Sequence, residues 1–144
     1  MKKVLAVIGI AILAGCATAP RREILAPSPS PLPVFSPAVR SGNLVFLSGQ
    51  IGAKPGTREI VSGGIEAETT QVLENIKGLL GQIGLGMEDV VKCSVFLADI
   101  ADYAKMNEIY ARYFPKAPPA RSTLAASGLA LGAKVEIECI AAAR

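Results

Sequence analysis

The chain has 144 residues, a formal charge of +3, an apolar fraction of 51% and no histidine. This length suits one domain, and the modest charge, with no basic run, leaves no electrostatic footprint for a nucleic acid. The lack of histidine excludes the serine–histidine–aspartate and cysteine–histidine nucleophilic systems and the usual zinc sites. Acid–base chemistry must therefore fall to carboxylate, lysine or tyrosine side chains.

Residues 1–15 have the pattern of a bacterial lipoprotein signal peptide. A basic start precedes the apolar residues 4–13, which are too few to span a bilayer. Residues 13–16 (Leu-Ala-Gly-Cys) resemble a lipobox, which implies cleavage before Cys16 and lipidation of its thiol. An ordinary secretory signal cut elsewhere, or an uncleaved anchor, is the alternative. The lipobox predicts an anchored protein on the periplasmic face of the cell envelope, and Ala17, in place of aspartate, favours the outer membrane.

Residues 16–37 are predicted to be a linker that follows the lipidated cysteine, and residues 38–144 the globular domain. The linker is rich in proline with serines between, a composition that blocks helix and favours extended chain. Within it, residues 23–25 fit a short edge strand. Such a segment can tether a globular body to a lipid.

The domain alternates strand patterns with helix patterns. Apolar, β-prone runs predict strands over residues 39–51 (a strand pair), 90–97, 121–127 and 134–142. Apolar residues three and four apart predict helices over residues 65–83 and 99–114. This order predicts an α+β fold in which two helices cover one face of a mostly continuous sheet. The other face would be bare and apolar, which predicts an oligomer.

Arg121 and the carboxylates of Glu136 and Glu138 are the residues best suited to chemistry. A guanidinium offers a planar fork to a carboxylate ligand, and a glutamate can hold a water or move a proton. If the last two strands form an antiparallel hairpin, Arg121 shares a face either with both glutamates or with Ile137 and Cys139, depending on the turn. The bland alternatives are a surface ion pair between Arg121 and Glu138, and glutamates on a solvated strand.

Cys93 and Cys139 lie inside two of the apolar runs. In an oxidising periplasm they could pair. We expect two buried free thiols instead, because nothing in the sequence brings the two positions together.

Four motifs occur in order along the chain: Ser48-Gly49-Gln50-Ile51, Asn107-x-x-Tyr110, Pro119-Ala120-Arg121-Ser122-Thr123 and Val135-Glu136-Ile137-Glu138. Together they resemble the reactive-intermediate deaminase (Rid, YjgF) family. The resemblance implies a chorismate-mutase-like fold, with a mixed six-stranded sheet and two helices on one face, and a homotrimer with clefts between subunits. It also implies hydrolysis of enamine and imine intermediates, such as 2-aminoacrylate and 2-iminopropanoate, to 2-oxo acids and ammonia. No metal or organic cofactor is implied.

By the same resemblance, Arg121 grips the substrate carboxylate and Glu136 positions the attacking water. The residues implied to line the pocket are Gly49, Asn107, Pro119 and Thr123, with Ser48 alongside. From the residues alone, Asn107 could equally be an exposed helix position and Ser48 a turn at a strand end. Tyr110 and Tyr113 are interpreted as core or interface.

Two positions depart from the family pattern. Many members have a tyrosine where this chain has Ala38, and an aromatic residue is common at Pro118. These departures, with the lipobox, motivate a second hypothesis: a non-catalytic envelope module that binds a carboxylate metabolite or a protein. A nuclease role finds no support in the charge.

Overall fold

The computed structural model describes residues 21–25 and 34–143, so the predictions for the signal peptide and Cys16 lie outside the described part of the chain. The strands are β1 (Arg22–Leu25), β2 (Ala38–Ser41), β3 (Leu44–Ile51), β4 (Val90–Leu97), β5 (Ala120–Ala125) and β6 (Val135–Ala142). The helices are α1 (Gly64–Gln82) and α2 (Tyr103–Tyr113), with short 3-10 turns at Met87–Asp89, Ile100–Asp102 and Ala130–Gly132. The described residues contain no helix that is both long and apolar enough to cross a membrane.

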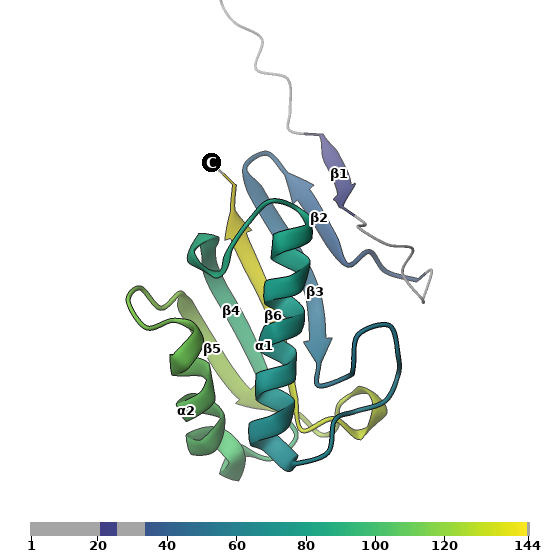
Figure 1. The fold of residues 1–144 in the computed structure, drawn as a ribbon, viewed down its shortest axis with the longest axis vertical. Helices are drawn as coiled ribbons and strands as arrows, with labels where there is room; N and C mark the ends of the chain where they lie inside the picture. The colour runs from purple at the N-terminus through teal and green to yellow at the C-terminus, as the bar shows by residue number, and fades with distance from the viewer. Residues whose placement is uncertain (1–20, 26–33, 144) are drawn as a thin grey trace, which may run out of the picture.

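The six strands form one mixed sheet in the order β1-β2-β3-β6-β4-β5 (Figure 1). Only β4 and β5 pair in parallel, as a crossover through a helix requires. The predicted chorismate-mutase-like fold is confirmed. The hairpin considered for the last two strands does not form, because β6 lies between β3 and β4.

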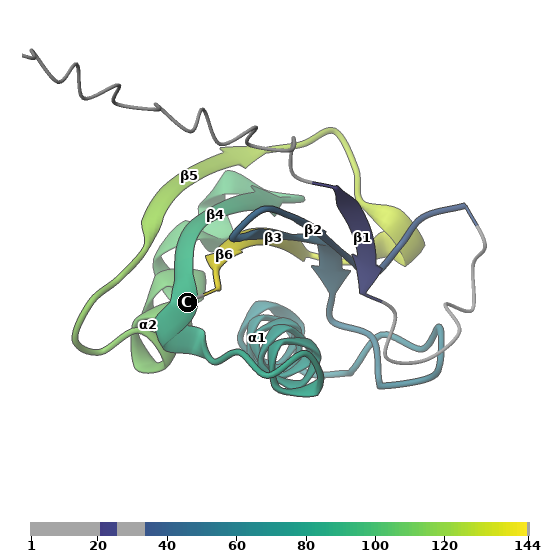
Figure 2. The same ribbon diagram turned by 90° about the horizontal axis from the view of Figure 1, so that it is seen from above.

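Both helices pack on the same face of the sheet, as Figure 2 shows. The stripe of α1 that faces the sheet is fully buried at Val72, Leu73, Ile76 and Leu80, within one core cluster. On the opposite face, Phe46 is 42% exposed. The apolar residues of α1, spaced three and four apart, thus lie on the side of the helix that faces the sheet, where the core forms.

Glu68 fastens α1 to the start of β6. Glu68 is only 4% exposed. Its Oε2 accepts a hydrogen bond from the backbone N–H of Lys134 at 2.8 Å, so the buried carboxylate has a polar partner. Gly52 allows this close packing, because a Cβ there would lie 2.8 Å from the Glu68 Cβ. The loop that ends β3 and the first turns of α1 are therefore in direct contact.

Cys93 and Cys139 form a disulfide, so the expectation of two free thiols is wrong. They are directly opposite residues of the antiparallel pair β4–β6, with their Cα atoms 4.2 Å apart. Both side chains are buried on the helix-facing side of the sheet. The 46-residue separation along the chain hides a contact that only the strand order reveals.

β1 pairs antiparallel with β2 at the edge of the sheet. The short edge strand that residues 23–25 were expected to fit is therefore confirmed. The described part of residues 16–37 therefore contributes a strand to the sheet. Ala38, the first residue of β2, is fully buried in the core.

Candidate functional site

Glu136 lies on the face of β6 opposite the helices and is half-buried. Gly49, beside a register shift in the neighbouring strand β3, is placed directly against it. A Cβ at residue 49 would overlap the Glu136 carboxylate, lying 2.9 Å from its Cδ. Only glycine lets the backbone of β3 approach this carboxylate so closely.

The surroundings of Glu136 raise its pKa above the ordinary glutamate value. Burial is the larger cause, because it disfavours the charged form, and the negative charge of Glu138 adds to it. Glu138 lies two residues along β6, on the same face, and is exposed. Glu136 thus keeps its proton to a higher pH than a free glutamate does.

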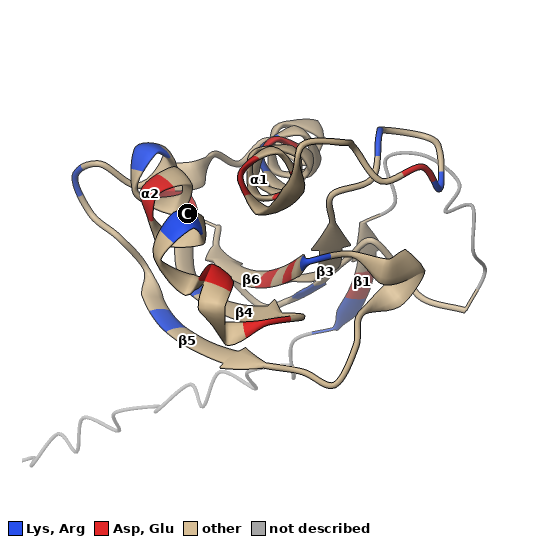
Figure 3. Cartoon of the chain, turned by 90° about the horizontal axis from the view of Figure 1, so that it is seen from below, with Lys and Arg blue, Asp and Glu red and all other residues tan. Residues whose placement is uncertain are grey.

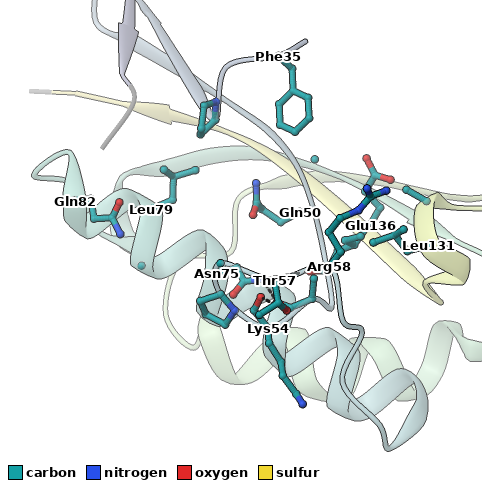
Figure 4. A pocket seen from close by; sticks show the side chains of 18 residues that line it. Phe35, Gln50, Lys54, Thr57, Arg58, Asn75, Leu79, Gln82, Leu131 and Glu136 are labelled. Atoms are coloured by element: carbon teal, nitrogen blue, oxygen red, sulfur yellow. Dashed lines mark hydrogen bonds between the residues drawn. The ribbon is translucent and has the colours of Figure 1, made fainter. Parts of the chain in front are cut away.

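A cavity of about 540 Å³ opens at Glu136. Figure 4 shows Phe35, Gln50, Arg58 and Leu131 around it. The cavity continues past the end of β3 to the flank of α1.

Arg121, near the start of β5, faces α2 and is held by two tyrosines. Its guanidinium carbon lies 4.6 Å from the centre of the Tyr110 ring and 5.8 Å from that of Tyr103. Its Nη2 donates a hydrogen bond to the Tyr103 hydroxyl at 3.3 Å. These are cation–π distances, and the described residues provide no ion pair to Arg121.

The two tyrosines differ in their acidity. A hydrogen bond from the Asn107 side chain, followed by the charge and hydrogen bond of Arg121, lowers the pKa of Tyr103. Burial raises the pKa of Tyr110 to about 12, although the charge of Arg121 acts against it. Tyr103 is therefore the phenol whose oxygen is best stabilised as a hydrogen-bond acceptor.

Three buried polar atoms near Arg121 have no hydrogen-bond partner among the described residues: Asn107 Oδ1, Tyr110 Oη and Thr123 Oγ1. Asn107 and Tyr110 lie three residues apart on one face of α2, and Thr123 lies two residues after Arg121 on the same face of β5. Since buried polar atoms are almost always paired, this cluster is suited to a small polar ligand. The predicted pocket positions Asn107 and Thr123 thus lie around Arg121.

Within one chain, however, Arg121 and Glu136 lie on opposite faces of the sheet. Arg121 is aligned with Cys93, which is aligned with Cys139 on the helix-facing side. Glu136 is three residues before Cys139 and points the other way. Of the two arrangements left open, Arg121 shares a face with Ile137 and Cys139 rather than with the glutamates. The alternative of a surface ion pair between Arg121 and Glu138 is therefore wrong.

Ser48 and Pro119 have different surroundings from the rest. The Ser48 hydroxyl donates a hydrogen bond to the Ser36 carbonyl at 2.7 Å, and its backbone N–H donates to the Pro37 carbonyl. Ser48 therefore holds the segment before β2 against β3. It lies within β3, at the register shift, so the alternative of a turn residue at a strand end is wrong. Pro119 immediately precedes β5 and is half-buried.

Tyr103 is the site residue that sequence reasoning missed. It lies four residues before Asn107 and seven before Tyr110, a spacing that places all three on one face of a helix. That spacing was a usable signal. Tyr110 is core, as interpreted, yet its ring also contacts Arg121. In residues 21–25 and 34–143, no group of three or more acidic or cysteine side chains is placed to hold a metal ion.

Comparison with known proteins places these features in a family. Residues 26–143 match the family model described as Endoribonuclease L-PSP. The chain is 44% identical over 133 residues to Reactive Intermediate Deaminase A of Arabidopsis thaliana, covering 91% of this chain and 71% of that protein. The Rid-family protein YyfA from Yersinia pestis superposes with a TM-score of 0.78 at 38% identity, covering 85% of this chain and 99% of that one.

RidA from an Antarctic Psychrobacter gives a TM-score of 0.75 at 38% identity, with 83% of this chain and 97% of that chain covered. The family model spans most of the chain, and both the identities and the superpositions agree with it. The chain therefore belongs to the Rid/YjgF (endoribonuclease L-PSP) family.

Proposed function

We propose that the protein hydrolyses reactive enamine and imine intermediates of the 2-aminoacrylate and 2-iminopropanoate type to 2-oxo acids and ammonia. The observation that carries the proposal is Arg121, which is half-buried and has no acidic partner among the described residues, beside three polar atoms that those residues leave unpaired. A small carboxylate ligand would satisfy this cluster. The name of the Arabidopsis relative, a reactive-intermediate deaminase, supports the reaction class.

The reaction needs little from the protein. The enamine tautomerises to the imine, whose carboxylate is gripped by the fork of Arg121. Glu136 accepts a proton from a water molecule while the oxygen of that water bonds to the imine carbon. The electron pair of the C=N π bond moves to the nitrogen, which takes up a proton. The carbinolamine nitrogen then takes up a second proton, the C–N bond breaks with its electron pair leaving on ammonia, and the hydroxyl loses its proton as the C=O bond of the 2-oxo acid forms. Orientation alone can lower such a barrier by several kcal/mol.

We further propose that the active unit is a homotrimer. Arg121 and Glu136 lie on opposite faces of one sheet, so the Glu136 of one chain would serve the Arg121 of the next. The bare face of the sheet supports this assembly, because it exposes apolar residues including Phe46 (42%) and Leu124 (50%). Packing the three sheets together would cover this face.

The proposed location is the cell envelope, with the protein anchored by lipid at Cys16. The disulfide between Cys93 and Cys139 supports an oxidising compartment. Since β1 starts at Arg22, the six steps from Cys16 reach about 20 Å at most. The anchor would therefore hold the β1 edge of the sheet near the membrane. Cys16→Ser should move the protein from the membrane to the soluble fraction; membrane retention would contradict lipidation at this residue.

Turnover tests the activity directly. A Cys16→Ala chain, which lacks the lipid, is added to an amino-acid oxidase acting on alanine or a dehydratase acting on serine, and release of 2-oxo acid is followed. The protein should accelerate that release, and Arg121→Ala should abolish the acceleration. An Arg121→Ala variant as active as the parent would rule out the assigned site.

A second candidate is a non-catalytic module that binds a carboxylate metabolite or a protein. The two separate half-sites favour it, because Arg121 alone could hold an acid without hydrolysing anything. Binding of 2-oxo acids without turnover would identify this function. A ribonuclease role, which the family description names, gains no support from the charge: Figure 3 shows Lys and Arg spread over several elements of the described chain.

A further inference from the structure

Arg121 contacts two tyrosines, Tyr103 and Tyr110, to which the reaction above gives no role. Tyrosines surround its guanidinium, and the ion pairs found among the described residues do not include it. The described residues therefore leave its positive charge unneutralised, and its N–H groups that do not face Tyr103 can bind a ligand. The direction in which the fork points then depends on the neighbouring hydroxyl and rings.

Tyr103 is the neighbour that can set this direction. It is the first residue of α2, which lies beside β5 in Figure 1. Its hydroxyl oxygen accepts a hydrogen bond from Arg121 Nη2 at 3.3 Å. The same oxygen also accepts a hydrogen bond from the side chain of Asn107. An oxygen that accepts two hydrogen bonds keeps its own proton for a third partner. Because Tyr103 is 40% exposed, a bound ligand can reach that proton.

We propose that Tyr103 is a positioning and specificity residue for the substrate carboxylate, an inference that rests on the proposed function. Its oxygen fixes one edge of the Arg121 guanidinium, so that the other N–H groups point at the ligand. Its O–H donates to the same carboxylate, which thus receives hydrogen bonds from both residues. The Tyr110 ring, 4.6 Å from the guanidinium carbon, supports the arrangement but is only 5% exposed.

Tyr103→Phe removes the hydroxyl and keeps the ring, and Tyr113→Phe is the matched control on the same helix. The Tyr113 hydroxyl donates to Glu74 at 2.8 Å and has no contact with Arg121. One lost hydrogen bond should raise KM about 3- to 10-fold in Tyr103→Phe with kcat nearly unchanged. Tyr113→Phe should keep the parent KM. An unchanged KM in Tyr103→Phe, or a loss confined to kcat, would overturn the role.

A binding measurement separates this proposal from the proposed function. Calorimetric titration with 2-oxobutanoate, a carboxylate that needs no hydrolysis, is made on the parent, Tyr103→Phe, Tyr113→Phe and Arg121→Ala. The positioning role is supported if the affinity for 2-oxobutanoate falls about 3- to 10-fold in Tyr103→Phe and stays at the parent value in Tyr113→Phe. This holds even if the parent has no turnover. Equal affinity in the parent and Tyr103→Phe rejects it, even if the parent is an active deaminase.

Discussion

Arg121 and Glu136 lie on opposite faces of the same sheet. Arg121 pairs across the strands with Cys93, and Glu136 pairs with Phe96. Neither can reach the other within a chain, because adjacent residues of a strand alternate between faces. The two halves have different neighbours: tyrosines of α2 around Arg121, and Gly49 against Glu136. If both residues act on one substrate, they must come from different chains.

Mixing two inactive variants tests this requirement. In the proposed homotrimer, Arg121→Ala and Glu136→Ala should each be inactive alone. After denaturation together and refolding, about one quarter of the sites in a random mixture would combine an intact Glu136 with an intact Arg121. We expect about that fraction of parent activity, measured as 2-oxo acid release. Separately refolded variants combined afterwards are the control, and a co-refolded mixture as inactive as this control would show that Arg121 and Glu136 of different chains do not act on one substrate.

Gly49→Ala should damage the site more than the fold. The added methyl would overlap the Glu136 carboxylate, which must move, and a displacement of about 1 Å can cost on the order of 100-fold in rate. Gly81→Ala is the matched control, since a Cβ there meets nothing within 4 Å and Gly81 does not line the cavity at Glu136. Rates and thermal midpoints are compared for both. Parent-like turnover in Gly49→Ala would show that the position of this carboxylate does not matter.

The parts of this fold that could be predicted from the sequence are those that local patterns encode. The period along α1 and the alternation along β4 and β6 placed these elements within one or two residues. The strand order could not be predicted, because it depends on pairing between segments far apart in the chain. The disulfide was missed for the same reason.

The site divides in the same way. Arg121 and the glutamates of β6 were singled out from their chemistry, and motif resemblance then selected Glu136 and added Gly49. The structure places Gly49 against Glu136. That Arg121 and Glu136 face apart depends on β6 lying between β3 and β4, which no local pattern encodes. Tyr103 was missed although its spacing from Asn107 was visible, because a tyrosine on a helix is more often part of the core.

The disulfide should contribute substantially to stability. Closing the loop between Cys93 and Cys139, 46 residues apart, lowers the entropy of the unfolded chain by an amount equivalent to about 4 kcal/mol. The double variant Cys93→Ser/Cys139→Ser should lose stability of this order, measured by urea unfolding without reductant. The parent in strong reductant should lose stability too, whereas reductant should leave the double variant unchanged. A parent insensitive to reductant under unfolding conditions would argue that the bond is not formed.

The activity should fall on the acid side at a pH set by Glu136. To accept a proton from water the carboxylate must be ionised, so turnover is lost as the pH falls through its pKa. Burial and Glu138 raise that pKa, so the loss should begin above the pH range in which an ordinary glutamate titrates.

Glu138→Gln removes a negative charge that opposes ionisation, which lowers the pKa of Glu136 and shifts the acid limb to lower pH. Profiles of kcat/KM against pH for the parent and Glu138→Gln measure the shift. Glu108→Gln, an exposed change on α2, is the control that should leave the limb in place. A limb that moves to higher pH in Glu138→Gln, or does not move, would mean that Glu136 is not the group that titrates.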